Sequence, residues 1–466
     1  MNDGLKKYEH FLKWFFIWMV AETVFLVGSI NKDYFLFKVL INYLFVLALL
    51  PLIYEKITRG RIDIFSPIAI FSFFYLLLFG VRSLDLLIFR PEILDADEKY
   101  YIYALIYAII GLHFFQLGYF SKIGQLIFIR KKLIADNWSG AKFKIVLFIY
   151  SAISLMSFLI MIKLSGGFVA YFGNISHATV GIISGKALLF MSVLLVKIPL
   201  LIWFCQALKS NKFSLSLSIF ICLVLLLFFS LGERGHLIFL IISLLICYHY
   251  LKNQLRTFTL VATIILVFSF LIIFSQYREF SKQNVKMKWN SFQIKLGAMT
   301  FYDQIVTEFD QLIRVKDIIR NVPEPLNYQY GKTFLNLIFK PIPSRNWESK
   351  PQGAGFVVTK TIYPKHFAAN ASIAVSLIGE LYLNFQIIGI ISGMFLFGVF
   401  NRTLYNFFKT NITNRNAVII YAFFVPYIFS ELRGDFAVVS SFLIFELFFL
   451  IVGLSFIKKN TIVKFV

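Results

Sequence analysis

The sequence is dominated by unbroken apolar runs of about 20 residues, the length at which an α-helix crosses a hydrocarbon core about 30 Å thick. The runs are apolar on all sides, whereas a surface helix of a soluble protein has one apolar stripe opposite a polar face. Hydrophobic residues make up 59% of the chain and charged residues 15%, whereas a soluble domain has about 45–50% and about 25%. The sequence therefore predicts an all-α polytopic membrane protein.

A hydropathy window of about 19 residues predicts twelve transmembrane helices. They lie near 11–30, 35–54, 62–81, 100–120, 143–163, 187–207, 213–231, 236–251, 257–275, 385–404, 416–432 and 436–457. The first run is too long for the apolar part of a signal peptide and is expected to remain as an anchor.

The connectors between the predicted spans alternate in charge. Every second connector is basic with almost no acid, so these connectors and both termini are predicted to be cytoplasmic. The formal net charge of +22 might suggest nucleic acid in a soluble chain, but here membrane topology explains it and no nucleic acid is expected. The short connectors on the other side are mixed or acidic. The one between the third and fourth spans carries Asp85, Glu92, Asp95, Asp97 and Glu98.

One long external segment, 276–370, breaks the pattern of short links. It holds fourteen Lys or Arg residues against seven Asp or Glu, and a connector of this length is expected to fold and to carry function. We expect an amphipathic helix near 300–320, where Ile305, Phe309 and Leu312 recur at helical spacing, and which ends before Pro323.

The chain is accordingly divided into three parts. Residues 1–275 form a bundle of spans one to nine, 276–370 form a large, partly helical periplasmic loop, and 371–466 hold spans ten to twelve. The run 371–400 is too long for one straight span. Its first part, with Glu380, is predicted to lie at the outer interface.

Charged residues from separate external connectors are predicted to meet near the outer membrane surface, below the long loop. The candidates for catalysis are Arg234, Arg278, Glu380 and Arg433. Arginine binds phosphate oxygens through two N–H groups and keeps its charge, so this cluster suits a lipid-linked diphosphate. A carboxylate is not needed for that, and Glu380 is a candidate base for a hydroxyl, with His236 and His366 as alternatives. The competing interpretation is that charges collect at helix ends because they reach water there.

Four further charges, Glu22, Lys163, Lys197 and Glu446, fall inside predicted spans. A charge at the centre of a membrane helix is costly, so each is expected to have a partner or a wet cavity. Lys197 and Glu446 are predicted to pair across helices, and an ion or proton pathway is the alternative.

Several kinds of site are not indicated. The three cysteines lie within apolar runs, so the sequence favours neither a disulfide framework nor a zinc site. No phosphate-binding loop, dinucleotide-binding motif or zinc-protease motif occurs in a suitable context. No metal and no cofactor is predicted.

Four short motifs in the second half of the chain resemble the bacterial O-antigen polymerase (Wzy) or oligosaccharide repeat-unit polymerase family. They are KPIPSRNWESKP at 340–351, IGELYLNF at 378–385, GERG at 232–235 and RGDF at 433–436. The layout of twelve spans with a large late external loop is also similar to that family. The glycine expected after the second motif is Gln386 here. The family's Arg-x10-Gly spacing fits Arg320 and Gly331, but the external segment 164–186 has no Arg.

The resemblance implies a glycosyltransferase that joins undecaprenyl-diphosphate-linked oligosaccharide repeat units at the periplasmic face of the inner membrane. Arg234, Arg278 and Arg433 then hold the diphosphate leaving group, and Glu380 activates the acceptor hydroxyl. Tyr330 offers a further aromatic face for sugar. The predicted substrate-binding residues are Arg320, Lys332, Arg345, Trp347, Lys350, His366 and Tyr382.

Expected partners besides the substrate and membrane lipid are a chain-length regulator and a flippase. Two alternatives remain at the level of sequence. One is another transferase that uses the same lipid carrier, such as an O-antigen ligase, and the other is a transporter of lipid-linked oligosaccharide.

Overall fold

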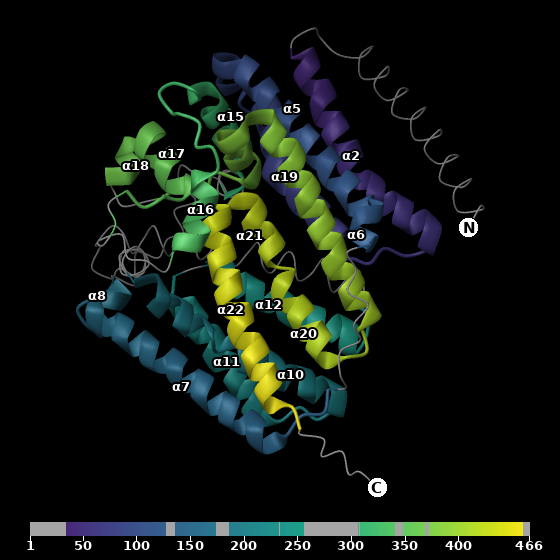
Figure 1. The fold of residues 1–466 in the computed structure, drawn as a ribbon, viewed down its shortest axis with the longest axis vertical. Coiled ribbons are helices and arrows are strands. Elements are labelled where there is room, and N and C mark those ends of the chain that lie inside the picture. The colour runs from purple at the N-terminus through teal and green to yellow at the C-terminus, as the bar shows by residue number, and fades with distance from the viewer. Residues whose placement is uncertain are drawn as a thin grey trace, which may run out of the picture. The chain divides into compact units, whose positions relative to one another are not determined.

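The computed structural model describes residues 34–126, 136–173, 186–232, 234–255, 306, 308–340, 347, 349–368 and 372–459. Their regular elements are helices (Figure 1), apart from one isolated antiparallel bridge between Trp138 and Lys458. The predicted all-α class is therefore confirmed for this part of the chain. The predicted spans 11–30 and 257–275 lie outside it, as does 276–305 of the long loop.

Seven helices in the described ranges are long and apolar enough to cross a membrane. They are Phe35–Thr58, Pro67–Ile88, Pro91–Phe120, Gly140–Leu164, Lys186–Ser210, Leu377–Thr410 and Phe436–Ile457. Leu215–Ser230 and Gly235–Leu251 are shorter apolar helices. The chain is a polytopic membrane protein.

The chain divides into two compact units. The first unit comprises Met1–Ile129, Val306–Asn406 and Ile428–Val439, and the second comprises Arg130–Ile305, Phe407–Tyr427 and Ser440–Val466.

The first unit combines an early helical bundle with the folded part of the long loop. Its helices are α2 (Phe35–Arg59), α3 (Pro67–Tyr75), the π-helical turn η1 (Leu76–Gly80), α4 (Val81–Ile88), α5 (Pro91–Phe120), α6 (Lys122–Leu126), α15 (Gln311–Asn321), α16 (Lys332–Phe339), α17 (Ala354–Ile362), α18 (Pro364–Ala368), most of α19 (Leu377–Thr410) and nearly all of α21 (Tyr427–Arg433).

Glycines let α5 and α19 approach each other closely. A Cβ atom on Gly118 would lie 2.0 Å from the carbonyl oxygen of Phe395, and one on Gly398 would lie 2.1 Å from that of Phe115. Small residues allow such backbone contact between membrane helices. Nearby, the rings of Phe71 and Phe115 stack. This contact fixes α19, which carries Glu380, against α5.

Two predicted span boundaries are wrong. The third span does not end near 81, because α3, η1 and α4 continue without a break to Ile88, so Asp85 is a buried helix residue rather than part of a connector. Its charge is matched there by Arg82. The predicted span 416–432 divides into α20 (Arg415–Phe424) and α21 at Pro426, whose nitrogen has no hydrogen to donate to a helical bond.

The second unit contains α7 (Gly140–Leu164), α8 (Phe168–Gly173), α10 (Lys197–Ser210), α11 (Leu215–Ser230), α12 (Arg234–Leu251), α20 and most of α22 (Phe436–Ile457). The predicted pair between Lys197 and Glu446 is confirmed: both side chains are buried and they contact each other directly. The hydroxyl of Tyr427 donates a second hydrogen bond to Glu446 at 2.5 Å, and the ammonium group lies 4.5 Å from the centre of the Phe423 ring.

Candidate active site

Helix α19 is broken between its first two turns and its long apolar part. Phe385 and Gln386 have non-helical backbone angles, and Gln386 has φ 56° and ψ −146°, a region that only glycine occupies without strain. After the break, a Cβ atom on Gly389 would lie 2.4 Å from the carbonyl oxygen of Leu381, and one on Gly393 would lie 2.3 Å from the Leu381 side chain. The break thus sets Leu377–Asn384 apart as a separate short helical segment.

Glu380 lies on this short segment and is completely buried, with 0% of its surface exposed. The Thr333 hydroxyl donates to its Oε1 at 2.6 Å, and the backbone N–H of Phe436 donates to its Oε2 at 2.8 Å. Glu380 is predicted from the sequence to act on a substrate hydroxyl, but the donors that it meets belong to the start of α16 and the start of α22. Glu380 therefore joins three elements of the first unit.

Asn384 completes this arrangement one turn after Glu380. Its Nδ2 donates to the Thr333 hydroxyl oxygen and to the Glu380 carbonyl oxygen, each at 2.8 Å. Its Oδ1 accepts the N–H of Gly331 at 2.8 Å. Sequence reasoning missed both Asn384 and Thr333. The four-residue spacing from Glu380 is a usable signal for Asn384, because it places both side chains on one helix face, but nothing in the sequence points to Thr333.

Asp435 is a second buried carboxylate, in the turn before α22. It accepts the N–H of Val438 at 3.2 Å, as an N-cap residue does, and also the N–H of Gly355 at 2.9 Å near the start of α17. Burial raises the pKa of the Asp435 carboxyl, although these N–H groups and nearby Lys340 favour its charged form. A Cβ atom on Gly353 would lie 2.3 Å from Asp435 Oδ2, so a larger residue there would displace the Asp435 side chain.

Arg433 is the one member of the predicted arginine trio whose side chain falls within the described residues. Its side chain is 40% exposed, and Nη2 lies 3.5 Å from Glu308 Oε2. Its carbonyl oxygen accepts the N–H of Ser376 at 3.1 Å, just before the segment that carries Glu380. Arg234 is the first residue of α12 in the second unit, with its side chain outside the described residues, and Arg278 lies wholly outside them. The convergence of the three arginines stays a prediction.

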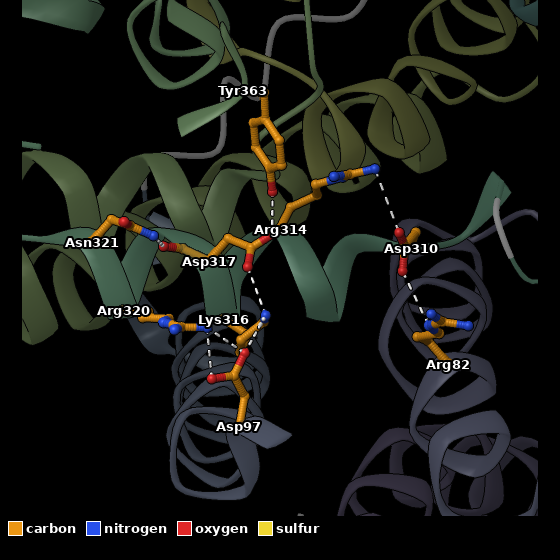
Figure 2. Close-up of polar contacts among 9 residues, drawn as sticks. All are labelled: Arg82, Asp97, Asp310, Arg314, Lys316, Asp317, Arg320, Asn321 and Tyr363. Carbon is orange, nitrogen blue, oxygen red and sulfur yellow. Dashed lines mark hydrogen bonds and ion pairs between the residues drawn. The ribbon is translucent and has the colours of Figure 1, made fainter. Parts of the chain in front are cut away.

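The predicted helix of the long loop is present as α15 and ends at Asn321 as expected, but it begins at Gln311 rather than near 300. Phe309 and Asp310 form a turn before it. Figure 2 shows how its charged residues bind α5. Arg320 Nη1 lies 2.8 Å and 2.7 Å from the two carboxylate oxygens of Asp97, and Lys316 Nζ lies 3.0 Å from the second of them. Asp97 interrupts the helical geometry of α5, with φ −142° and ψ 26°. Arg320, a predicted substrate-binding residue, is thus engaged in holding the loop.

A second part of the same network connects α15 to α4 and α17 (Figure 2). Asp310 lies between two arginines, with Oδ1 3.1 Å from Arg82 Nε and Oδ2 3.5 Å from Arg314 Nη2. Burial raises the pKa of the Asp310 carboxyl to about 6 despite these two cations. Tyr363 donates its hydroxyl hydrogen to Asp317. The charged side of α15 is therefore used for docking within the first unit.

The other predicted substrate-binding residues have varied surroundings. Tyr382 is buried, with its ring 5.2 Å from Tyr107 and 6.3 Å from Tyr328 between centroids. Trp347 packs its ring edge-on to Phe339 at 5.0 Å and donates to Ser349 at 2.8 Å. Arg345 lies outside the described residues.

The remaining predicted positions differ chiefly in exposure. Lys332, at the first position of α16, and His366, on α18, are exposed, and Tyr330 is largely exposed. Lys350 is buried, and its Nζ lies 3.4 Å from the Lys340 carbonyl oxygen. Within the described ranges, no group of three or more His, Cys, Asp or Glu side chains is arranged to hold a metal ion.

The arrangement around α19 provides a rigid, buried frame of polar groups with a partly exposed arginine beside it. The hydrogen bonds of the frame are made within the protein, so the frame can hold the backbone that carries Arg433 in place. The Arg433 guanidinium group could then meet an anionic substrate. It does not by itself identify a reaction.

Comparison with known proteins supplies that identification. Searches of curated proteins and of solved structures returned no match. The family model described as O-antigen polysaccharide polymerase Wzy matches residues 14–464, nearly the whole chain and all of the helices described above. The chain therefore belongs to the O-antigen polysaccharide polymerase Wzy family, glycosyltransferases that polymerise lipid-linked oligosaccharide repeat units.

Proposed function

We propose that the chain polymerises repeat units on undecaprenyl diphosphate at the periplasmic face of the inner membrane. The growing polysaccharide is the donor, the new lipid-linked repeat unit is the acceptor, and undecaprenyl diphosphate leaves. The observation that carries the proposal is the family match over residues 14–464. The proposal includes twelve membrane spans with both termini in the cytoplasm, which the alternation of basic connectors supports.

Arg433 is proposed to hold the donor's diphosphate together with Arg234 and Arg278. As the anomeric bond breaks, negative charge grows on the leaving diphosphate, and guanidinium groups held near it stabilise that charge. The partial exposure of Arg433 and its long contact to Glu308 support this role, because the guanidinium group can exchange one carboxylate for a more highly charged diphosphate.

Glu380 has two candidate roles in this reaction. As a general base it would take the proton of the acceptor hydroxyl, which requires one of its oxygens to exchange a present donor for the substrate. As a positioning residue it would keep its bonds to Thr333 and Phe436 and hold the turn that carries Arg433. Its complete burial supports the second role.

Sugar recognition is proposed to involve the aromatic and basic residues of the loop. Tyr330, which is largely exposed, and Trp347 offer ring faces for sugars. Tyr382 is buried against Tyr107 and Tyr328 and is proposed to support the site from within the protein. The cationic loop residues Lys332 and Arg345 would bind the second diphosphate or sugar hydroxyls. A chain-length regulator and a flippase are proposed as protein partners, since the substrate must be delivered and the length of the product controlled.

The proposal is tested in cells by the length of the surface polysaccharide. Arg433→Ala is expected to restrict the product to a single repeat unit on a gel while the protein is still made and inserted. Arg61→Ala is the matched control, because Arg61 is exposed and lies outside the proposed site, and it should give the normal ladder. Long ladders from Arg433→Ala would contradict the role of Arg433.

A second pair of variants separates the two roles of Glu380. If Glu380 is a base, Glu380→Gln abolishes chain extension without lowering the thermal stability of the purified protein. If it is a positioning residue, Glu380→Gln lowers stability and activity together, and Thr333→Val produces the same combination.

A further inference from the structure

Helix α16 has its polar and apolar faces reversed relative to a helix of a soluble domain. Thr333 and Asn336, three residues apart, share the face that points into the protein, and they are 0% and 5% exposed. Leu335 and Ile338 share the opposite face and are 43% and 68% exposed. In a soluble domain the apolar face of an eight-residue helix is the one that packs inward.

Both residues of the inward polar face donate hydrogen bonds to other parts of the protein. Thr333 donates to Glu380 at 2.6 Å, and Asn336 Nδ2 donates to the carbonyl oxygen of Pro351 at 2.6 Å. These bonds fix the rotation of α16 about its axis. Leu335 and Ile338 are therefore held outward, and turning them inward would break the bond between Thr333 and Glu380 and the bond between Asn336 and Pro351.

The outward apolar face continues onto the apolar surface of α19. The rings of Phe334 and Phe385 are stacked at a centroid distance of 6.4 Å. Phe385 is 45% exposed, and Ile388, at the start of the long apolar part of α19, is 70% exposed. That part of α19 is long and apolar enough to cross a membrane, so its exposed apolar side chains are expected to face lipid, and the face of α16 lies alongside them.

An exposed lysine stands at the start of α16. Lys332 is its first residue, whereas Lys340, which follows its last, lies near the buried carboxylate of Asp435. A lysine at the end of an apolar helix face can extend along it and place its ammonium group among lipid phosphates. An outward apolar face with a lysine at its start is typical of a helix that lies in the membrane interface.

We infer that α16 is an interfacial helix whose Leu335 and Ile338 side chains are inserted among the lipids of the bilayer. The occupant of this face is bulk membrane lipid, which the continuity with α19 favours over a protein partner. The inference goes beyond the proposed function, since it rests only on the chain being a membrane protein. The bonds from the Thr333 hydroxyl to Glu380 and from the Gly331 N–H to Asn384 would transmit the depth of α16 in the bilayer to the frame beside Arg433.

Spin-label accessibility tests this inference directly. Cys205, Cys222 and Cys247 are replaced by alanine, and Leu335→Cys and Ile338→Cys are each labelled with a nitroxide in the full chain. The chain is reconstituted in vesicles of phosphatidylethanolamine and phosphatidylglycerol. Lys365→Cys on α18 is the matched control, since Lys365 is an exposed, charged residue of the same unit.

The expected result is preferential relaxation of the labels at 335 and 338 by oxygen, which concentrates in lipid, and a loss of accessibility to a water-soluble nickel complex relative to the label at 365. Nickel accessibility equal to that of the control would overturn the inference, because the face would then be in water. Protection from both reagents would also overturn it, because protein would then cover the face. The measurement uses no substrate, so its failure leaves the proposed polymerase reaction intact.

Discussion

Arg320 and Asp97 are 223 residues apart in the sequence, and their side chains are joined by hydrogen bonds of 2.8 Å and 2.7 Å. The contact attaches α15, from the long loop, to the point where α5 departs from helical geometry. Lys316 binds the same carboxylate. The loop helix is therefore held to the first unit by charge as well as by its buried apolar side, to which Leu312, Val315 and Ile318 belong.

Asp97→Asn is expected to loosen this attachment. It removes the charge that Arg320 and buried Lys316 share, and hydrogen bonds to charged groups contribute about 1.5–3 kcal/mol. The expected loss in the free energy of unfolding is about 2 kcal/mol, measured by denaturation in detergent, with faster proteolysis after Lys316. Glu92→Gln, at an exposed position on the same helix, should change neither quantity. Equal stability of the two variants would contradict the role of Asp97.

Asp310 is expected to make stability depend on pH between about 4 and 6. Its pKa is about 6 in the folded protein, raised by burial from an ordinary value of 3.8. The folded state therefore binds the proton more tightly, and this group's contribution to stability is present below pH 4 and is lost as the pH rises through 6. The loss is at most about 3 kcal/mol.

The comparison for that prediction is Asp310→Asn, which cannot ionise. Its unfolding midpoint should fall less than that of the wild type between pH 4 and pH 6, and the two curves should run parallel above pH 7. Parallel curves over the whole range would exclude Asp310 as the titrating group.

Lys197→Met is expected to destabilise the second unit strongly. Removing one partner of a buried ion pair leaves the other charge without compensation, at a cost of about 3–5 kcal/mol. The double variant Lys197→Met with Glu446→Gln should recover most of the loss, because the amide is neutral and can still accept the hydrogen bond from Tyr427. Thermal unfolding in detergent measures both, and a double variant no more stable than the single one would argue against the pairing.

Gln386→Gly is expected to stabilise the protein. The backbone of Gln386 occupies a region that costs a residue with a Cβ atom about 1–3 kcal/mol, and glycine loses part of this gain through its greater freedom in the unfolded chain. A net gain of about 1 kcal/mol is expected from chemical denaturation. Gln386→Ala keeps the Cβ atom and should give no gain, so a similar gain from alanine would show that the backbone strain is not the cause.

The features predicted correctly are those that depend on local pattern or on a large energetic penalty. Apolar runs predicted α7 and α22, because a soluble protein has no place to bury a long helix that is apolar on all sides. The pair between Lys197 and Glu446 was predicted because an isolated charge in a membrane is energetically costly. The end of α15 at Asn321 followed from the prolines after it.

Other features depend on contacts between distant segments, which no local pattern encodes. The bond from Thr333 to Glu380 exists because α16 folds against α19, and threonine in a loop helix gives no sign of it. The sequence predicted that 371–400 is too long for one straight span and that span ten begins at 385, and α19 is interrupted there. The strained backbone of Gln386 was not predicted, because glutamine is an ordinary helix residue. The division of the predicted span 416–432 does have a local signal, which is Pro426.

The most direct test of the central claim is a reaction of purified protein with a defined undecaprenyl-diphosphate-linked repeat unit in the presence of a chelator. The account predicts head-to-tail dimers and longer products from the wild type and from Arg61→Ala, and none from Arg433→Ala although that variant remains folded. Undiminished polymer from Arg433→Ala, or movement of the lipid-linked oligosaccharide across a vesicle membrane with no new glycosidic bond, would contradict it.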